Sequence, residues 1–360
     1  MKKAILFLLF CSFLNTIQAQ TPAFKTYSKF DFISGEKVVF VEDFAQAAIG
    51  DFPAKWNTNG SGEIVTLVGQ QGKWLKINGK TKVFPEFVNN LPENFTLEFN
   101  IVADPAFNYA NDNFSLVFTP STDLKKLFSA NFQSRVEASF TPFNKVLGSS
   151  NANVYGSDSK QIMSNKARVN FGFPDKPMVK ISIWRQASRL RVYVDEAKIW
   201  DLPTAFDASS FKKIIFSTTP TLSGQAFYLS GFRLAIGAPD TRNKLITEGK
   251  FVTTGILFDS NSDKIKGESY GILKQIAEVL QENMDVKIRI IGHTDSDGDD
   301  AKNLDLSKRR AISVKNNLVN EFGIDASRFQ TDGKGETQPM APNSSPEGKA
   351  NNRRVEFVKL

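Results

Sequence analysis

Apolar and polar residues alternate in short runs through the first two thirds of the chain, and Gly, Pro, Asn and Asp separate these runs. Such alternation is typical of β-strands that bury one face, and no long stretch here shows a helical period. Residues 179–203 read as three strands joined by tight turns at 187–188 and 196–197. The pattern predicts an all-β sandwich. Its clearest strands are expected at 95–103, 114–119, 178–185, 189–195, 211–218 and 227–236.

The last 110 residues follow a different pattern, in which strand-like and helical segments alternate. Each expected helix carries one apolar stripe, which would pack on a sheet. Leu273, Ile276, Ala277 and Leu280 form the first stripe, and Ala311, Val314, Leu318 and Phe322 form the second. This part is predicted to be a small α/β sandwich. We expect its helices at 268–283 and 307–322 and its strands at 251–258, 286–293, 328–332 and 354–359.

Composition changes where the pattern changes. Residues 20–250 contain 24 Phe and all 4 Trp, whereas residues 251–360 contain 5 Phe. The formal net charge is +7, and the C-terminal 110 residues contribute −1 to it. We therefore expect a multidomain protein: a β-sandwich at 20–237 whose Phe residues fill its core, a linker at 238–250, and the α/β domain at 251–360. This modest charge gives no case for nucleic-acid binding.

The N-terminus has the pattern of an export signal. Residues 1–3 supply a positive end, residues 4–14 are apolar, and a polar exit ends at Ala19. We expect a signal peptide at 1–19. Cys11 is the only cysteine and would leave with this peptide, so neither a disulfide nor thiol chemistry is expected in the mature chain. Lipidation of Cys11 is the alternative.

The β-rich part resembles the jelly-roll domains of concanavalin-like and laminin-G-like proteins. VEDFAQ and GDFPAKW, within 40–56, are similar to their first strand, and 184–202 is similar to their hairpin. Such domains often bind sugars, and we expect this one to reach a further partner, a glycan or an outer-membrane protein. Glucanases of this class carry Glu-x-Asp-x-Glu on one strand, and because this chain has no such run, hydrolysis is not expected. The loop at 104–113 could be an ordinary polar loop or a calcium site with ligands from Asp104, Asn108, Asn111, Asp112 and Asn113.

Four motifs follow one another in the C-terminal part: GHTDSDG at 292–298, NLDLSKRRAISV at 303–314, GKGETQP at 333–339 and NNRRVEF at 351–357. In this order they resemble the OmpA-like peptidoglycan-binding domain. FDSNSDKI at 258–265 is similar to that family's first strand and loop, so the resemblance spans essentially all of residues 251–360. It implies non-covalent binding of peptidoglycan in a Gram-negative envelope.

Asp295 and Arg310 are the candidate binding residues. If Ser307 caps the second helix, Arg310 lies in its first turn, beside free backbone N–H groups that can help to hold an anion. A guanidinium can grip a carboxylate with two parallel hydrogen bonds. Asp295 leaves the strand 286–293 toward the same pocket, and the two charges together suit a zwitterion. A structural ion pair between Asp295 and Arg310, without a ligand, is the alternative.

By resemblance, Asp295 and Arg310 grip the diaminopimelate of the peptidoglycan stem peptide, and Asn303, Asn261 and Arg353 join the pocket. Asn303 could instead cap a turn with its side chain. One residue of the pair Arg353 and Arg354 could be a solvated strand charge.

Metal and catalytic sites are not expected. His293 is the only histidine, and without a mature cysteine no zinc site is predicted. The acidic run 295–300 lacks the Gly and Glu of a calcium loop, since Asp300 and Leu306 stand at those two positions. No GxSxG motif occurs. We predict a non-enzymatic protein that needs no cofactor and no metal.

The whole sequence predicts an exported protein at the periplasmic side of the outer membrane, whose C-terminal domain binds peptidoglycan and tethers the sandwich. Two alternatives remain. Residues 22–240 could form an integral outer-membrane β-barrel, although Arg185, Arg189 and Arg191 in the expected strands argue against it. The sandwich could also be a surface lectin that the C-terminal domain anchors to the wall.

Overall fold

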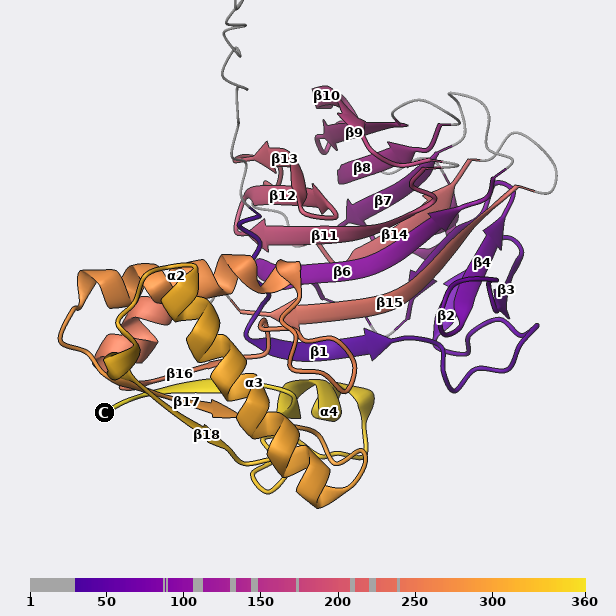
Figure 1. Cartoon of the computed structure of the whole chain (residues 1–360). Helices are drawn as coiled ribbons and strands as arrows, with labels where there is room; N and C mark the ends of the chain where they lie inside the picture. The colour runs from indigo at the N-terminus through magenta and orange to yellow at the C-terminus, as the bar shows by residue number, and fades with distance from the viewer. Residues whose placement is uncertain are drawn as a thin grey trace, which may run out of the picture.

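The computed structural model describes residues 30–86, 88, 90–105, 113–129, 134–143, 148–172, 175–207, 211–219, 225–237 and 240–360. Within these ranges, two β-sheets form the larger, N-terminal half, and a small sheet with helices forms the C-terminal half (Figure 1). The predicted signal peptide lies outside the described residues. No helix in the described ranges is long and apolar enough to cross a membrane.

Two antiparallel sheets with open edges make up the N-terminal half. The first has the order β13-β12-β11-β6-β15-β4-β3, with β1 also paired to β15. The second has the order β10-β9-β8-β7-β14-β5-β2. The strands of the first sheet are β1 (Lys37–Glu42), β3 (Gly62–Val65), β4 (Trp74–Asn78), β6 (Asn94–Ala103), β11 (Met178–Gln186), β12 (Arg189–Val194), β13 (Ala197–Leu202) and β15 (Ala226–Ile236). Those of the second are β2 (Trp56–Thr58), β5 (Lys82–Pro85), β7 (Phe114–Thr119), β8 (Arg135–Thr141), β9 (Gly148–Tyr155), β10 (Gln161–Val169) and β14 (Lys213–Thr218), and a short helix, α1 (Leu124–Phe128), follows β7.

Phenylalanine rings from the facing strands fill the space between the two sheets. Phe99 and Phe232 of the first sheet stack with centroids 5.4 Å apart, and Phe216 of the second sheet lies 5.5 Å from Phe99. All three are at most 1% exposed. Burying a side chain of this size contributes about 1.5 to 3 kcal/mol to stability. The excess of Phe before residue 250 therefore serves the core, as the composition predicts.

The alternating pattern locates the described strands well. The run predicted at 114–119 has the same bounds as β7, and the meander at 179–203 is confirmed, because β11, β12 and β13 are antiparallel neighbours. Its second turn comes one residue earlier than expected, at Asp195, whose φ of 50° is left-handed. The jelly-roll class stays a prediction.

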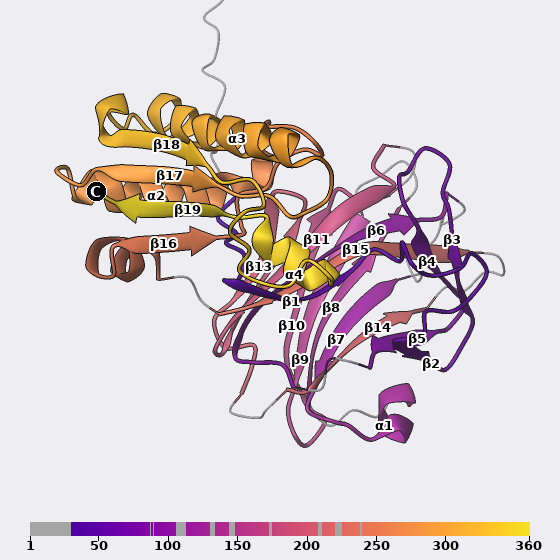
Figure 2. The same cartoon turned by 90° about the horizontal axis from the view of Figure 1, so that it is seen from below.

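In the C-terminal half, a sheet of order β16-β19-β17-β18 packs against two helices (Figure 2). The apolar stripes predicted for both helices lie in one core, with Leu273, Ile276, Val314 and Leu318 at most 2% exposed. This confirms the predicted α/β arrangement. The elements are η1 (Asn243–Thr247), β16 (Lys250–Thr253), η2 (Gly267–Ser269), α2 (Tyr270–Glu282), β17 (Ile288–Gly292), α3 (Asp300–Asn320), η3 (Ala326–Arg328), β18 (Phe329–Gly333), α4 (Pro346–Asn352) and β19 (Val355–Lys359).

Helix α3 begins seven residues before the predicted cap, and this changes the position of Arg310. The side chain of Asp299 accepts a hydrogen bond from the backbone N–H of Lys302 at 3.0 Å, so Asp299 is the N-cap. Ser307 is therefore inside the helix, and Arg310 lies ten residues after its first residue, Asp300. The predicted place of Arg310 beside the free N–H groups of a helix start is wrong. The sequence pattern did not indicate the start of α3, because the first turns of this helix are polar and carry no apolar stripe.

The two halves of the chain are in contact through β1 and α4. Asn351 of α4 accepts from the backbone N–H of Val38 at 3.1 Å and donates to its carbonyl oxygen at 2.9 Å. Glu347 accepts from the N–H of Val41 at 3.3 Å. Among the described residues, β1 pairs with β15, and these side chains satisfy backbone groups of β1 on its other edge. Within the range predicted as a linker, Leu245 of η1 belongs to the C-terminal core and is fully buried.

Candidate functional site

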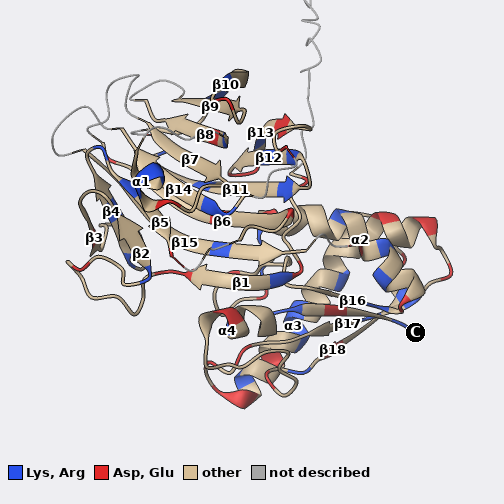
Figure 3. Cartoon of the chain, turned by 180° about the vertical axis from the view of Figure 1, so that it is seen from behind, with Lys and Arg blue, Asp and Glu red and all other residues tan. Residues whose placement is uncertain are grey.

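Four segments meet at one end of the C-terminal sheet and form the candidate site. They are the loop 254–266 after β16, the segment 293–299 after β17, helix α3, and the junction of α4 with β19. Acidic residues of the segment after β17 and the start of α3 lie at the tip of this half, drawn red in Figure 3. The segments come from widely separated parts of the sequence, so the fold of this half positions the site.

Close packing between the sheet and α3 explains two glycines of the motifs. A Cβ atom at Gly292 would lie 2.2 Å from the carbonyl oxygen of Ser307, and one at Gly333 would lie 2.4 Å from the Ser307 hydroxyl. No side chain fits at such distances. The Ser307 hydroxyl donates to the carbonyl oxygen of Leu304 at 2.7 Å and accepts from the N–H of Gly335 at 2.9 Å. Ser307 thus fixes the loop after β18 to the helix and does not cap it.

All five predicted site residues line one cavity of about 440 Å³. The sequence motifs therefore identified side chains that the fold brings together. The cavity has equal numbers of basic and acidic side chains in its lining, and an aromatic ring adds an apolar wall. The lining residues are Phe258, Asp259, Ser260, Asn261, Lys266, Thr294, Asp295, Asp297, Asn303, Leu306, Arg310 and Arg353.

Asp295 is the buried anion of the cavity, with 8% of its surface exposed. One of its carboxylate oxygens accepts from the N–H of Asp297 at 3.2 Å, and the other forms an ion pair with Arg353. The side chain of Arg353 is 47% exposed, so the arginine of this pair is the accessible partner. The alternative prediction was an ion pair between Asp295 and Arg310. Within the described residues, these two side chains form no such pair.

Arg310 reaches from α3 across to the loop after β16. Its Nε donates to the carbonyl oxygen of Ser262 at 2.9 Å, its Nη2 makes a long contact of 3.5 Å with that of Asp259, and its guanidinium lies 4.8 Å from the ring centre of Phe258. Burial, followed by the nearby charge of Arg353, lowers the pKa of Arg310 from its ordinary value. An arginine does not lose its proton in proteins, so the shift marks a cation whose charge its surroundings do not fully balance.

Asn303 holds the acidic loop in place. It is 7% exposed, and its amide nitrogen lies 3.1 Å from the carbonyl oxygen of Asp297 and 2.6 Å from a carboxylate oxygen of Glu336. It also reaches the carbonyl oxygen of Asp295 at 3.3 Å. The side chain therefore orders the turn that presents Asp295, which agrees with the turn-capping interpretation of Asn303.

The remaining predicted residues lie at the edge of the cavity. Asn261 is exposed and has a φ of 53°, in the left-handed region that Asn tolerates better than most residues. Of the two neighbouring arginines, Arg353 faces the cavity. Arg354 is 5% exposed and binds Glu356 through two nitrogens, at 2.7 and 3.0 Å. Arg354 is thus a buried structural residue, whereas Arg353 is the solvent-exposed arginine of the two.

Thr294 is a lining residue that sequence reasoning missed. Its hydroxyl is buried, and no described residue gives it a hydrogen-bond partner. The signal was present in the sequence, because Thr294 stands between His293 and Asp295 in the motif GHTDSDG. A buried hydroxyl without a protein partner can receive a hydrogen bond from, or give one to, a ligand.

His293 belongs to a neighbouring buried cluster. It is 2% exposed, and its Nε2 lies 3.3 Å from Glu356, which also binds Lys250 at 2.6 Å. Burial opposes ionisation of Glu356, but His293, Lys250 and Arg354 outweigh it and hold the pKa of Glu356 far below its usual value. No group of three potential metal ligands occurs in the described part of the chain. The proposed calcium loop lies largely in 106–112, outside that part.

Comparison with known proteins matches the domain that carries this cavity. The model of the OmpA family matches residues 257–353, and this segment is an OmpA-like domain. Outer membrane porin F of Pseudomonas aeruginosa is 42% identical over 105 residues, which cover 29% of this chain and 30% of the porin. The probable lipoprotein YiaD of Escherichia coli K12 is 45% identical over 103 residues, covering 29% of this chain and 47% of YiaD.

Among solved structures, the peptidoglycan-associated lipoprotein of Burkholderia pseudomallei is 25% identical and has a TM-score of 0.29. The alignment covers 34% of this chain and 98% of that protein. This chain spans less than half the length of the curated relatives described above. The alignment with each of these two curated relatives covers 29% of this chain.

Proposed function

We propose that residues 251–360 bind peptidoglycan non-covalently through the diaminopimelate of its stem peptide, and that they tether the N-terminal sandwich to the cell wall at the periplasmic side of the outer membrane. One observation carries the proposal. Asp295, Arg310 and Arg353 line a single cavity in a domain that matches the OmpA family. Binding without turnover is the role that this arrangement supports.

The charges around the cavity suit a zwitterionic ligand. Three cations, Lys266, Arg310 and Arg353, face three anions, Asp259, Asp295 and Asp297. A neutral zwitterion leaves this balance unchanged, whereas a ligand with a single charge would upset it. The free end of a diaminopimelate side chain carries an ammonium group and a carboxylate on one carbon, so it offers both charges close together.

Each side chain has a role that follows from its contacts. Arg310 keeps its Nη1 without a partner among the described residues, and we assign this group to the ligand carboxylate. Asp295 accepts from the ligand ammonium while Arg353 stays beside it. Asn303 positions Asp295, and the ring of Phe258 contacts the aliphatic part of the ligand.

The N-terminal sandwich is the part that this anchor holds. We propose that it reaches a second partner, a glycan or an outer-membrane protein, as the resemblance of its strands to jelly-roll domains suggests.

Cosedimentation of the mature protein with purified sacculi tests the anchor. Sacculi that contain diaminopimelate should bring the protein into the pellet, and sacculi with lysine at the same position should bring much less, because lysine lacks the carboxylate that Arg310 holds. Equal sedimentation with both would contradict the assignment of the ligand. Absence from both pellets would contradict peptidoglycan binding itself.

A further inference from the structure

A second, smaller cavity of about 180 Å³ lies where the two halves of the chain meet. Val41 of β1 and Arg233 of β15 form its N-terminal side. The C-terminal half supplies the rest of the lining. Phe258, Arg310 and Arg353 line both this cavity and the larger one, so the two cavities are neighbours. We call the smaller one the junction cavity.

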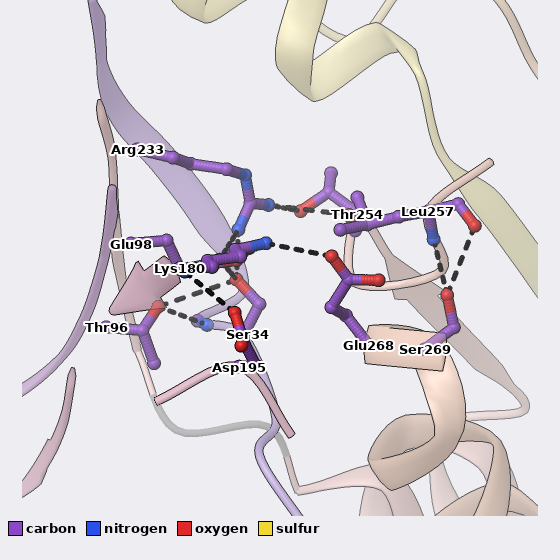
Figure 4. Close-up of polar contacts among 11 residues, drawn as sticks. Ser34, Thr96, Glu98, Lys180, Asp195, Arg233, Thr254, Leu257, Glu268 and Ser269 are labelled. Atoms are coloured by element: carbon purple, nitrogen blue, oxygen red, sulfur yellow. Dashed lines mark hydrogen bonds and ion pairs between the residues drawn. The ribbon is translucent and has the colours of Figure 1, made fainter. Parts of the chain in front are cut away.

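A buried polar network holds the N-terminal side of the junction cavity in place (Figure 4). Arg233 donates to Glu98 at 2.9 Å and to the hydroxyl of Thr254, across the junction, at 2.8 Å. Lys180 lies 2.8 Å from Glu98 and 3.4 Å from Glu268 of the C-terminal half. Glu98 is 3% exposed. The guanidinium of Arg233 is therefore fixed from both halves of the chain.

The lining of the junction cavity is basic. It contains Arg233, Arg310, Arg353 and Arg354 and no carboxylate. Three of these arginines have one carboxylate partner each, in Glu98, Asp295 and Glu356. Arg310 has no carboxylate partner among the described residues, and its two hydrogen bonds go to backbone carbonyl oxygens.

His293 adds a second sign of a missing ligand. It lines the junction cavity at 2% exposure; its Nε2 lies 3.3 Å from Glu356, and its Nδ1 makes no hydrogen bond to a described residue. Leaving a buried polar group unpaired is unfavourable. A bound group with hydrogen-bonding atoms would remove this cost.

Apolar side chains complete the lining. Val41, Ile256, Leu257 and Val355 contribute to it, so the ligand must carry a small apolar part beside its negative charge. A volume near 180 Å³ is comparable to that of a cavity of about 150 Å³ that holds benzene. The space therefore suits one small residue and excludes a large one.

We propose that the junction cavity is a second subsite for the stem peptide, which takes a small residue ending in a carboxylate, attached to the diaminopimelate in the larger cavity. This inference rests on the proposed function and extends it. In this arrangement the sandwich forms part of the wall-binding site, because Val41 and Arg233 come from its strands. The carboxylate meets Arg233, while Arg310, which lines both cavities, keeps its Nη1 for the diaminopimelate carboxylate; the apolar side chain meets Val41 and Val355.

Two peptide probes test the inference by calorimetry on the full mature protein. The first is a muramyl tripeptide that ends at diaminopimelate, and the second is extended by one D-alanine. We expect the wild type to bind the extended peptide about tenfold more tightly, since a hydrogen bond to a charged group contributes about 1.5 to 3 kcal/mol. Equal affinity for the two peptides would overturn the junction subsite and leave the proposed function intact. Binding of neither would overturn both.

Single substitutions show which residues produce the preference for the extended peptide. Arg233→Met should remove the preference for the extended peptide and retain binding of the tripeptide, and Arg233→Lys should restore part of the preference. Arg189→Met is the matched control, because Arg189 also pairs with a carboxylate of the first sheet but does not line the cavity. If Arg233→Met unfolds, Val41→Phe tests the same point by filling the cavity from the other strand. A preference that survives both substitutions would refute the role of the sandwich.

Discussion

Replacement of Arg310 by alanine tests the candidate site most directly, since its neighbour provides a matched control. Arg310→Ala removes a guanidinium from the lining of the cavity, while alanine keeps the helix. Arg309→Ala removes the same group one residue away, where it pairs on the surface with Asp305 at 2.8 Å and Asp263 at 3.4 Å. The two variants have the same composition and differ only in the place of the lost cation.

The expected magnitudes follow from these contacts. Arg310 would lose a charged hydrogen bond to the ligand, worth about 1.5 to 3 kcal/mol, so affinity for diaminopimelate-containing sacculi should fall by about 10-fold to 150-fold. Arg310→Ala also removes the hydrogen bond to Ser262, which should lower the free energy of unfolding by about 1 kcal/mol. Arg309→Ala loses exposed pairs worth about 0 to 1 kcal/mol in stability and should bind as the wild type does.

Cosedimentation over a range of protein concentrations measures the affinities, and thermal unfolding followed by circular dichroism shows that each variant is folded. The reasoning is refuted if folded Arg310→Ala sediments with the same half-saturation as Arg309→Ala. A loss shared by both variants would also refute it, because the effect would then reflect general charge and not the cavity.

Three further predictions concern other parts of the molecule. Asp295→Asn keeps the shape of the side chain and removes its charge, so sacculus binding should fall at least tenfold with unchanged circular dichroism; retained binding would exclude an ammonium contact. Burial disfavours ionisation of Glu98, but Lys180 and Arg233 lower its pKa to about 2 from an ordinary 4.5. The unfolded state then binds the proton more readily than the folded state does. The stabilising contribution of Glu98 should therefore be complete above about pH 4.5 and be lost as the pH falls toward 2. Urea unfolding at several pH values should show that the free energy of unfolding depends less steeply on pH in Glu98→Gln than in the wild type. Gly292→Ala would place Cβ 2.2 Å from a backbone oxygen of α3 and should lower the melting temperature by several degrees; an unchanged melting temperature would show that the sheet can move away from α3.

Sequence reasoning succeeded where the signal is local or repeated. Strand β7 has a simple alternation, and the apolar stripe of α2 has a regular period, so both were located from the pattern. Asp295 and Arg310 were proposed from charge and position, and Asn303, Asn261 and Arg353 from the resemblance to the OmpA-like domain; the structure places all five in the lining of one cavity. Period and spacing carry this information without knowledge of the tertiary structure.

The start of α3 and the contact between the halves could not be predicted in this way. The first turns of α3 are polar, and their only signal is the capping side chain of Asp299. Asn351 binds Val38 across 313 positions of the sequence, and no local pattern reports such a pair. The partner of Asp295 was also missed, because Arg353 and Arg354 are adjacent and only the direction of each side chain separates their roles.

Helix α4 covers one edge of β1, and this matters when the two halves of the chain are expressed separately. A strand with unpaired N–H and C=O groups is a template for another strand, and proteins block such edges to avoid aggregation. Here the block consists of Asn351 and Glu347, which belong to the other half of the chain. The sandwich expressed alone would therefore present the bare edge of β1 to its own copies. The C-terminal half thus also protects the edge of the strand beside it from pairing with other copies.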